Sequence, residues 1–330
     1  MWNTIQCAIQ GRGHIESNTP CQDKTFSEHG NNVYAISLAD GAGSASLSHF
    51  GAESATKFIC LDMIQNFDVY YNNQNGVEVK QILIEKLLEN IKNKSAELQC
   101  DITELASTLL FVAIKNNKFI LGHIGDGVIG YLKDNELKVA SHPENGEFTN
   151  TTFFTTSHNA IATMKLIKGS LNDITGFVLM SDGTETSLYN KSTGKIADIT
   201  KKIMTLSNYI PKENVQRLTE NSFNSVIINQ TTDDCSLIVI SKSTTNFNGY
   251  NSLPDSAKKS LLELKSDTPK RIMTRYDYII NALSVPVSAN TLAKKVHLKP
   301  KFVNKYLFHL LKLNFIEKQN GLYKTVLTLQ

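Results

Sequence analysis

Apolar segments that meet an aspartate recur four times in this chain, and this repeat constrains its fold more than any other feature. Each segment has the length and composition of a buried strand, and its acidic residue is next to a glycine or a second aspartate. The four junctions are Asp40-Gly41, Asp126-Gly127, Asp182-Gly183 and Asp233-Asp234. If the strands lie side by side, these junctions bring several carboxylates into one cleft, where they repel each other unless cations neutralise them.

A single aspartate at the end of a strand is usually a turn former, so the inference rests on the four together. Oxygen ligands without a cluster of His or Cys favour Mg²⁺ or Mn²⁺ over zinc. Gly41 and Gly43 allow positive φ angles and a close approach of the backbone, so that a carboxylate and main-chain carbonyls can face one ion. Two such ions can share a water, lower its pKa and direct the hydroxide at a phosphorus atom.

The composition is that of a soluble globular protein. Of the 330 residues, 41% are hydrophobic and 20% charged, and no apolar run approaches the ~20 residues that a membrane helix needs. The N-terminus lacks a basic region followed by an apolar one, so we expect a cytoplasmic protein with no membrane partner. The five cysteines are scattered without a Cys-x-x-Cys pair, which predicts reduced packing residues. They are Cys7, Cys21, Cys60, Cys100 and Cys235.

The order of apolar runs predicts an α+β fold. Strands are expected in residues 2–10, 33–39, 107–114, 119–132, 176–181 and 237–240, with a polar loop that carries Cys21-Gln22-Asp23 between the first two. Helical spacing begins near Ser48, resumes after the Asn-rich stretch 72–76, and returns across roughly 195–228. No regular βαβ alternation is present, so a sandwich of sheets flanked by helices fits better than a doubly wound sheet.

The C-terminal part of the chain reads as a separate, basic domain. We expect one domain at 1–242, a polar linker at 243–256 and a second domain at 257–330. Residues 251–330 contain 14 basic and 5 acidic residues, a net charge of +9, which leaves −6 for residues 1–250 out of the chain's total of +3. Such asymmetry suggests different partners for the two parts.

Three short helices and a hairpin are expected in this second domain, which is the order of a winged helix. Ser288 suits the cap of the second helix, Pro300 the first turn of the third, and Asn320-Gly321 the hairpin turn. On the third helix, the lysines at 301, 305 and 312 lie opposite its apolar residues. A basic helix face beside a hairpin is typical of DNA binders, and it equally suits docking of a protein or autoregulation, so both interpretations remain open.

Read in order, the aspartate junctions and their neighbours resemble motifs of the metal-dependent Ser/Thr phosphatases of the protein phosphatase 2C (PPM) family, over roughly residues 5–242. Ala39-Asp40-Gly41, Ser181-Asp182-Gly183 and Asp233-Asp234-Cys235-Ser236 are similar to the family's Ala-Asp-Gly, Ser-Asp-Gly and Asp-Asn-x-Thr. Cys21-Gln22-Asp23, Ser107-Thr108 and Ile124-Gly125-Asp126 look like its Asn-Glu-Asp, Gly-Ser-Thr and Val-Gly-Asp. The stretch from Gly13-His14 to Gly43-Ser44-Ala45 looks more like a divergent bacterial branch.

This resemblance implies an α-β-β-α sandwich of two antiparallel sheets that binds two or three Mn²⁺ or Mg²⁺ ions. It implies that Asp40 bridges two metals and that Gly41 supplies a carbonyl. Asp182 and Asp233 would complete the ligands, Asp126 would help to bind a third ion, and Asp23 would hold metal-bound waters. The catalytic residues implied are Asp40 and Asp23, and we add His14 as a residue that could contact phosphate.

The activity implied is hydrolysis of phosphoserine or phosphothreonine in a protein by a metal-bound hydroxide. The implied partners are a phosphorylated protein substrate and a Ser/Thr kinase, with weak DNA contact by the C-terminal domain as a further option. The alternative is a catalytically weak regulator on the same scaffold, which binds phosphoproteins or DNA.

Several residues depart from the family pattern. Gln22 replaces a Glu, and Asn18 stands where the family has a phosphate-binding Arg, a role that Arg12 or His14 could take over. Ala42 replaces a His that some relatives carry, which implies that a metal-bound water protonates the leaving alkoxide. Asp234 stands where the family has Asn, and we expect it to support the site. His123 lies within a strand and is expected to be a packing residue.

Overall fold

The computed structural model describes residues 1–134, 136–143, 152–185, 187–209, 212–243, 247–313 and 315–327. The chain divides into two compact units. The first unit contains residues 2–201 and 218–241, and the second contains Met1 with residues 202–217 and 242–330. The expected domain boundaries at 242 and 257 are close to this division but do not anticipate the assignment of residues 202–217 to the second unit.

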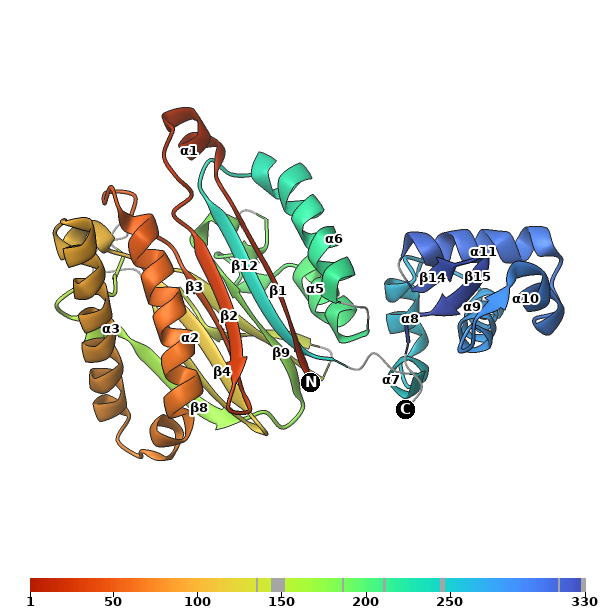
Figure 1. Ribbon diagram of the computed structural model, residues 1–330, viewed down its shortest axis with the longest axis horizontal. Coiled ribbons are helices and arrows are strands. Elements are labelled where there is room, and N and C mark those ends of the chain that lie inside the picture. The colour runs from red at the N-terminus through yellow and green to blue at the C-terminus, as the bar shows by residue number, and fades with distance from the viewer. Residues whose placement is uncertain are drawn as a thin grey trace. The chain divides into compact units, whose positions relative to one another are not determined.

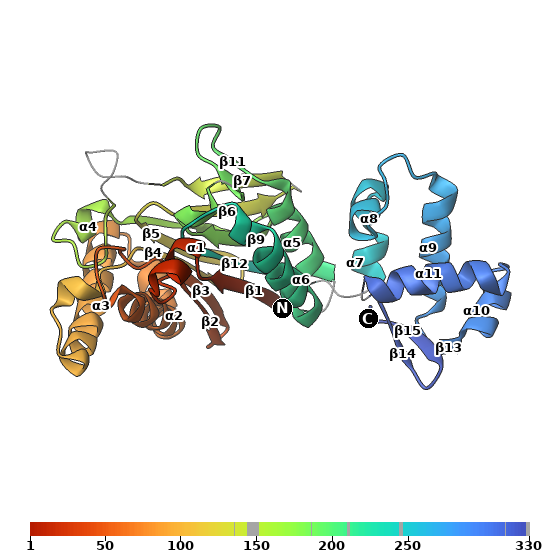
Figure 2. The same ribbon diagram turned by 90° about the horizontal axis from the view of Figure 1, so that it is seen from above.

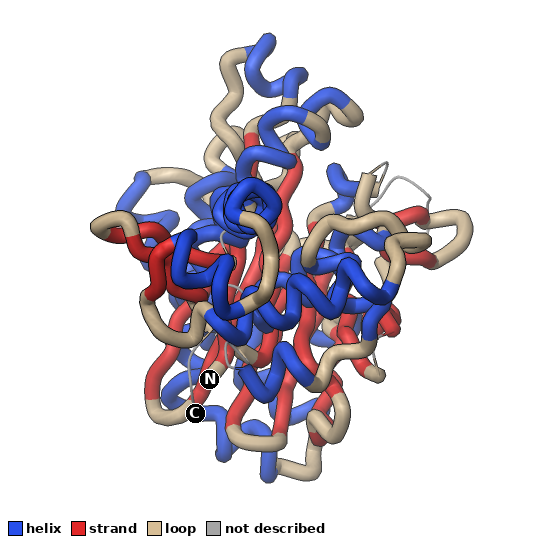
Figure 3. Tube along the Cα trace, turned by 90° about the vertical axis from the view of Figure 1, so that its right-hand side faces the viewer, coloured by secondary structure: helices blue, strands red, loops and turns tan. Residues whose placement is uncertain are grey.

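Two five-stranded sheets form the centre of the first unit, and their strands lie side by side in Figure 1 and Figure 3. One sheet has the order β1 (Trp2–Ile9), β12 (Cys235–Lys242), β9 (Ile174–Met180), β6 (Val128–Lys133) and β7 (Glu136–Ser141). The other has the order β2 (Lys24–Gly30), β3 (Val33–Ala39), β4 (Leu109–Lys115), β5 (Lys118–Ile124) and β8 (Lys165–Ser170). The pairings along β2-β3-β4-β5-β8 and along β12-β9-β6-β7 are antiparallel. The expectation of an antiparallel sandwich is therefore confirmed.

Apolar side chains on both faces of the second sheet hold the layers together. On one face, Ile36, Val112 and Leu121 pack with Phe177 and Ile238 of the first sheet. On the other face, helices α2 (Ser48–Asn72) and α3 (Gly76–Leu98) cover the strands, as Figure 2 shows. Alternating residues of a strand point to opposite faces, so a strand with two apolar faces reads as the continuous apolar run seen at 33–39.

The remaining elements between residues 10 and 234 are shorter, and two of the helices extend into the second unit. These shorter elements are α1 (Arg12–Ser17), η1 (Ile102–Leu105), α4 (Ala160–Thr163), η2 (Asp182–Thr184), β10 (Tyr189–Asn190), β11 (Lys195–Ile196), α5 (Asp198–Tyr209), α6 (Lys212–Ser225) and η3 (Ile227–Asn229). All five cysteines are free thiols, and burial raises the pKa of Cys7, Cys21 and Cys60 to about 12. Thiols with such pKa values are weak nucleophiles, which agrees with the packing role expected for them.

The sequence analysis missed strands β7 and β8, and it placed a polar loop between the first two expected strands where the structure has a helix and a strand. Residues Arg12–Ser17 form α1, and Lys24–Gly30 form β2. Strand β2 lies at the edge of its sheet, and no residue within it is fully buried. An edge strand that buries so little needs few apolar residues, so its sequence carries only a weak alternating pattern.

In the second unit, the structure contains the three helices and the hairpin expected from the sequence. The elements are α7 (Phe247–Asn251), α8 (Asp255–Leu261), α9 (Lys270–Ala282), β13 (Val287–Ser288), α10 (Ala289–Lys295), α11 (Pro300–Lys312), β14 (Ile316–Gln319) and β15 (Leu322–Thr325). The side chain of Ser288 caps α10 by accepting from the Thr291 N–H at 3.2 Å, and Pro300 is in the first turn of α11. The strands pair in the order β13-β15-β14.

The expected linker lies entirely within this second unit. Of residues 243–256, positions 244–246 lie outside the described residues, and Phe247–Asn251 form α7. The Tyr250 side chain is fully buried and donates to Asp277 Oδ1 of α9 at 2.8 Å. The stretch is rich in Asn and Ser, which favours a linker locally, but burial of one large aromatic side chain outweighs that preference. Among the described residues, no helix combines the length and the apolar character needed to span a membrane.

Candidate active site

Strand register brings the aspartate junctions to the same end of the two sheets. Strand β3 ends at Ala39 and pairs with β4 through Leu38 and Leu110, so Asp40 follows directly beside the start of β4. In the other sheet, Met180 at the end of β9 pairs with both Leu237 of β12 and Val128 of β6. Neighbouring antiparallel strands alternate in direction, so the end of one lies beside the start of the next. This alternation places Asp182, Asp126 and Asp233 together.

A cavity of about 160 Å³ opens at this end, and all four junctions contribute to its wall. Its lining residues are His14, Gln22, Asp40, Gly41, Ala42, Gly43, Thr108, Asp126, Thr152, Phe154, Asp182 and Asp233. The clustering of carboxylates that was expected if the strands lay side by side is thus present. Four carboxylates in one small cavity create a strongly negative site.

Thr108 fixes the position of Asp40 through two hydrogen bonds. The Asp40 N–H donates to Thr108 Oγ1 at 2.8 Å, and the Thr108 N–H donates to the Asp40 carbonyl at 2.8 Å. Another hydroxyl, that of Thr152, donates to Asp126 Oδ2 at 2.6 Å from across the cavity. These bonds therefore hold the backbone of Asp40 and the carboxylate of Asp126 in place.

Burial and mutual repulsion raise the pKa values of these carboxyl groups. Desolvation raises the pKa of Asp40 well above its ordinary value, and the neighbouring charges of Asp23 and Asp182 raise it further. Desolvation also raises the pKa of Asp182 to about 6, with a further contribution from Asp126. The Asp40 and Asp182 carboxyl groups lie close enough to share a hydrogen bond. In the absence of a cation the cluster therefore retains protons that isolated carboxylates would release.

Asp23 lies behind the cavity wall. Its side chain is only 1% exposed, and Oδ2 accepts from Ser181 Oγ at 2.7 Å. Burial raises the pKa of Asp23 to about 7, while the Ser181 hydrogen bond opposes this shift. The position is that of a residue which acts through Asp40 and Asp182, its electrostatic neighbours, rather than by direct contact with a substrate.

The donor set of the cavity fits a hard divalent cation. Two buried carboxylate oxygens, Asp23 Oδ1 and Asp182 Oδ1, have no hydrogen-bond partner. Such orphaned acceptors are costly unless a cation or water satisfies them. Across the described residues, no three His, Cys, Asp or Glu side chains converge closely enough to hold an ion by protein ligands alone. A cation that keeps several waters and binds through one or two carboxylates, as Mg²⁺ does, matches this arrangement.

Gly41 is required at its position for a different reason from the one expected. Neither Gly41 nor Gly43 has a positive φ angle, so that part of the interpretation is wrong. A Cβ on Gly41 would lie 2.7 Å from Ser48 Oγ, whereas a Cβ on Gly43 would meet nothing within 4 Å. Close packing against the start of α2 therefore demands glycine at 41, and no packing contact demands it at 43.

Of the residues considered for contact with phosphate, His14 is the one that the structure brings to the cavity. Arg12 is exposed, and its Nε donates to the Thr231 carbonyl at 3.2 Å. Asn18 is exposed and ends α1 with a φ of 61°. Gln22 reaches the cavity wall, but its amide donates to Ser48 Oγ at 2.8 Å. Residue 22 therefore joins the loop to α2 and adds no charge to the site.

Asp234 has a larger structural role than the sequence indicated. Its side chain is 2% exposed and accepts from the Gly11 N–H at 2.7 Å and the Gln22 N–H at 2.5 Å. Because these two residues bracket α1, one carboxylate fastens both ends of the loop that carries His14. The pair of aspartates at 233–234 is the sequence feature that could have indicated this role. Successive side chains of an extended chain face opposite ways, so one points toward the cavity and the other into the protein.

His123 is a buried packing residue, as expected. Burial lowers its pKa to about 3, so the ring is neutral. Its Nε2–H donates to the Gly125 carbonyl at 2.9 Å, which leaves Nδ1 to accept from Ser141 Oγ at 2.6 Å. Gly125 has a φ of 113°, and the contact supports the turn that leads into Asp126.

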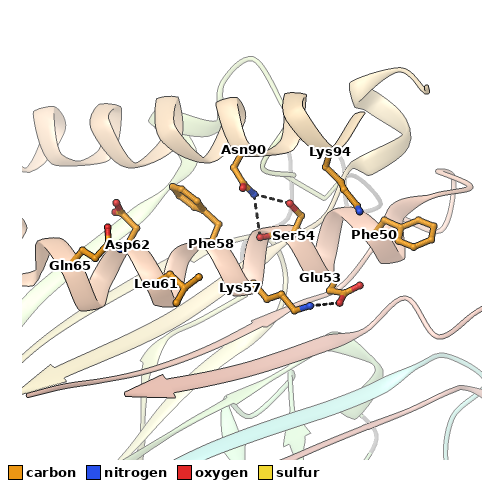
Figure 4. Close-up of a pocket in the computed structure, with 10 residues that line it drawn as sticks. All are labelled: Phe50, Glu53, Ser54, Lys57, Phe58, Leu61, Asp62, Gln65, Asn90 and Lys94. Carbon is orange, nitrogen blue, oxygen red and sulfur yellow. Dashed lines mark hydrogen bonds and ion pairs between the residues drawn. The ribbon is translucent and has the colours of Figure 1, made fainter. Parts of the chain in front are cut away.

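A second and larger hollow, of about 440 Å³, lies on the outer helical layer between α2 and α3 (Figure 4). Its polar side chains largely satisfy one another. Asn90 donates to Ser54 Oγ at 2.7 Å, and Lys57 pairs with Glu53 on the same helix. Acidic and basic groups alternate here without converging on a point, so the hollow has no arrangement suited to catalysis.

Comparisons with known proteins agree with this architecture. A sequence profile described as protein phosphatase 2C matches residues 10–221. Serine/threonine-protein phosphatase 3 of Escherichia coli (strain K12) is 22% identical over 169 residues, which cover 50% of this chain and 66% of that protein, just under two thirds of its length.

Solved structures show the same fold. The chain resembles a bacterial serine phosphatase with a TM-score of 0.53 at 12% identity, over 74% of this chain and 99% of that one. It also resembles the serine/threonine phosphatase Stp1 from Staphylococcus aureus, with a TM-score of 0.50 at 12% identity, over 74% of this chain and 96% of that one. The relatives that it resembles are, by name, serine or serine/threonine phosphatases, and the matching profile is that of a protein phosphatase. Because the profile covers more than half of the chain, the chain belongs to the protein phosphatase 2C family.

Proposed function

We propose that this protein hydrolyses phosphoserine or phosphothreonine in a protein substrate, with Mn²⁺ or Mg²⁺ bound at the aspartate cavity. The observation that supports this most directly is the convergence of four aspartates from both sheets, with buried carboxylate oxygens that lack partners. A site with this many carboxylates favours cations over neutral ligands. Its substrate would be the product of a Ser/Thr kinase.

In this proposal Asp40, the Gly41 carbonyl, Asp182 and Asp233 hold two ions, and Asp126 contributes to a third. Such ions, when bound, supply Lewis acidity that lowers the pKa of water and neutralises phosphoryl charge. Thr108 holds the Asp40 backbone in register, and Asp23 with Ser181 supports the cluster from behind. His14, at the cavity wall, is the group available to meet the substrate.

Mn²⁺ is expected to stabilise the wild-type protein against thermal unfolding. The bound ion neutralises the charges of the carboxylates and so removes their mutual repulsion. At 100 times its Kd it adds about 2.7 kcal/mol to the free energy of unfolding, which corresponds to a rise in Tm of roughly 5–10 °C. Differential scanning calorimetry of the EDTA-treated protein, with and without added Mn²⁺, measures this shift. Asp182→Asn should reduce the shift, while the exposed Asp134→Asn should retain it. The metal site would be disproved by equal unfolding temperatures with and without the ion.

The alternative function is a phosphoprotein-binding scaffold with lost turnover, which the departures at Gln22 and Asn18 motivate. Release of phosphate from a phosphothreonine peptide in the presence of Mn²⁺ separates the two. Turnover above that of an Asp40→Asn variant supports the enzyme. Tight binding of the peptide without turnover supports the scaffold.

We also propose that the second unit contains a winged-helix module for docking or regulation. The support is its order of elements, α9-β13-α10-α11-β14-β15, and the strand order β13-β15-β14. On α11 the side chains of Lys301, Lys305 and Lys312 are exposed, and Phe308 among them is 73% exposed. An aromatic side chain within a lysine stripe suits a protein surface better than a phosphate backbone, and no Arg here offers bidentate contacts to bases.

If the module docks a protein, we expect the full-length chain to bind DNA weakly and with little dependence on salt. Fluorescence anisotropy with a labelled duplex at low and moderate ionic strength measures this directly. A Lys305→Ala variant should change the result little. A steep loss of affinity with added salt, reduced by Lys305→Ala, would instead assign the surface to nucleic acid.

A further inference from the structure

Hydrolysis of a phosphoserine or phosphothreonine ester requires a proton for the departing oxygen, because an alkoxide is a poor leaving group. Ala42 occupies a place in the cavity wall where it offers no proton. Among the described residues that line the cavity, the groups able to give up a proton are four aspartates and His14. The aspartates are the expected ligands of the cations, which leaves His14 as the side chain that can give the proton in place of the metal-bound water expected from the sequence.

His14 lies against a buried carboxylate. Its Nδ1 is 2.9 Å from Asp234 Oδ1, and its side chain is 22% exposed. The two side chains are in contact without an aligned hydrogen bond, because Nδ1 has no partner that meets hydrogen-bond geometry. With Nδ1 directed at Asp234, Nε2 is the ring nitrogen left for a ligand in the cavity.

Asp234 is itself held more firmly than the histidine. It accepts from the N–H groups of Gly11 and Gln22, which lie before and after α1. The Gly13 N–H adds a bond to the Thr232 carbonyl at 2.8 Å. A Cβ on Gly11 would lie 2.2 Å from the Asp233 carbonyl carbon, so the loop packs directly against the backbone beside Asp234. The carboxylate therefore sets the place of the loop, and through it the place of His14 beside the cavity.

We propose that His14 is the general acid for the leaving serine or threonine oxygen and that Asp234 is its positioning residue. This rests on the proposed phosphatase function. The oxygen of water bonds to phosphorus as the bond from phosphorus to the side-chain oxygen breaks, and the electron pair of that bond passes to the departing oxygen. His14 Nε2 gives this oxygen its proton, the attacking water loses one to solvent, and the imidazole regains a proton from solvent. One water is consumed for each ester.

Two substrates with different leaving groups test this assignment. The departing oxygen of a phosphothreonine peptide needs a proton, whereas the p-nitrophenolate of p-nitrophenyl phosphate leaves without one at neutral pH. His14→Gln should lower kcat for the peptide by about 10²–10³-fold and kcat for p-nitrophenyl phosphate by less than about tenfold. Asp234→Asn should show the same selectivity with a smaller loss. His29→Gln, an exposed histidine on β2, is the matched control.

Calorimetric titration with Mn²⁺ gives a readout independent of activity, and His14→Gln should keep the wild-type affinity. Equal losses of kcat on both substrates would overturn the proposal, as would a loss of Mn²⁺ affinity that explains the defect. If Asp234→Asn fails to fold, His14→Gln still decides, because its partly exposed ring carries little packing. Failure of the proposed function itself would look different: wild-type protein would hydrolyse neither substrate with Mn²⁺.

Discussion

Asp40→Asn should abolish phosphatase activity while making the metal-free protein more stable. The change removes the proposed bridging ligand, and a bound metal contributes several kcal/mol to stabilising charge in the transition state, so we expect kcat to fall by at least about 10³-fold. Folding raises the pKa of Asp40, and a carboxyl group with a raised pKa destabilises the folded state at pH values above its ordinary pKa. At neutral pH without metal, the neutral amide should therefore add roughly 1–3 kcal/mol to the free energy of unfolding.

Assays of phosphopeptide hydrolysis and urea unfolding in EDTA measure the two effects on one preparation. Asp134→Asn makes the same chemical change on an exposed carboxylate and should alter neither quantity. The test rests on the opposite directions of the two effects, a fall in activity and a rise in the free energy of unfolding. A variant that lost both activity and stability would mean that Asp40 supports the fold, and one that kept its activity would remove it from the site.

Gly183→Ala should destabilise the protein by roughly 2–4 kcal/mol, although the substitution adds a single methyl group. A Cβ at residue 183 would lie 1.9 Å from the Asp234 carbonyl oxygen, a distance that neither backbone can tolerate. Relief requires the end of β9 to separate from the start of β12. Because these two ends carry Asp182 and Asp233, activity should fall together with stability.

Gly43→Ala provides the matched comparison. It follows an Asp-Gly pair and lines the cavity, yet a Cβ there would meet nothing within 4 Å. Its free energy of unfolding should stay within about 0.5 kcal/mol of wild type. Urea denaturation of both variants checks the contrast. Similar losses in the two would contradict the packing argument for Gly183.

Local rules account for the parts of the fold that the sequence predicted. Continuous apolar runs marked the buried strands, Ser288 caps α10 by accepting from the Thr291 N–H, and Asn320-Gly321 forms the hairpin turn with φ angles of 50° and 77°. Each of these signals depends on residues a few positions apart. The motif order around the aspartates also led to the family that the comparisons identify.

Long-range packing explains what was missed. Strand β2 is held by backbone pairing with β3 at a sheet edge, although none of its residues is fully buried. Helix α7 depends on burial of Tyr250 against residues of α9. The sequences of β2 and α7 show no periodic pattern from these interactions, because the residues that stabilise each element lie elsewhere in the chain.

The aspartates at the strand ends were determined by the sequence alone, since a buried apolar run must end where a charged side chain can reach solvent or a cation. The tertiary structure decided which of their neighbours matter. In the folded protein, Arg12 and Asn18 lie outside the cavity wall, whereas His14 is part of it. The buried side chain of Asp234 contacts that histidine. These assignments depend on how α1 packs against residues 231–234 more than 200 positions later. Such packing is set by the register of the sheets and by space for backbone contact, which no local pattern encodes.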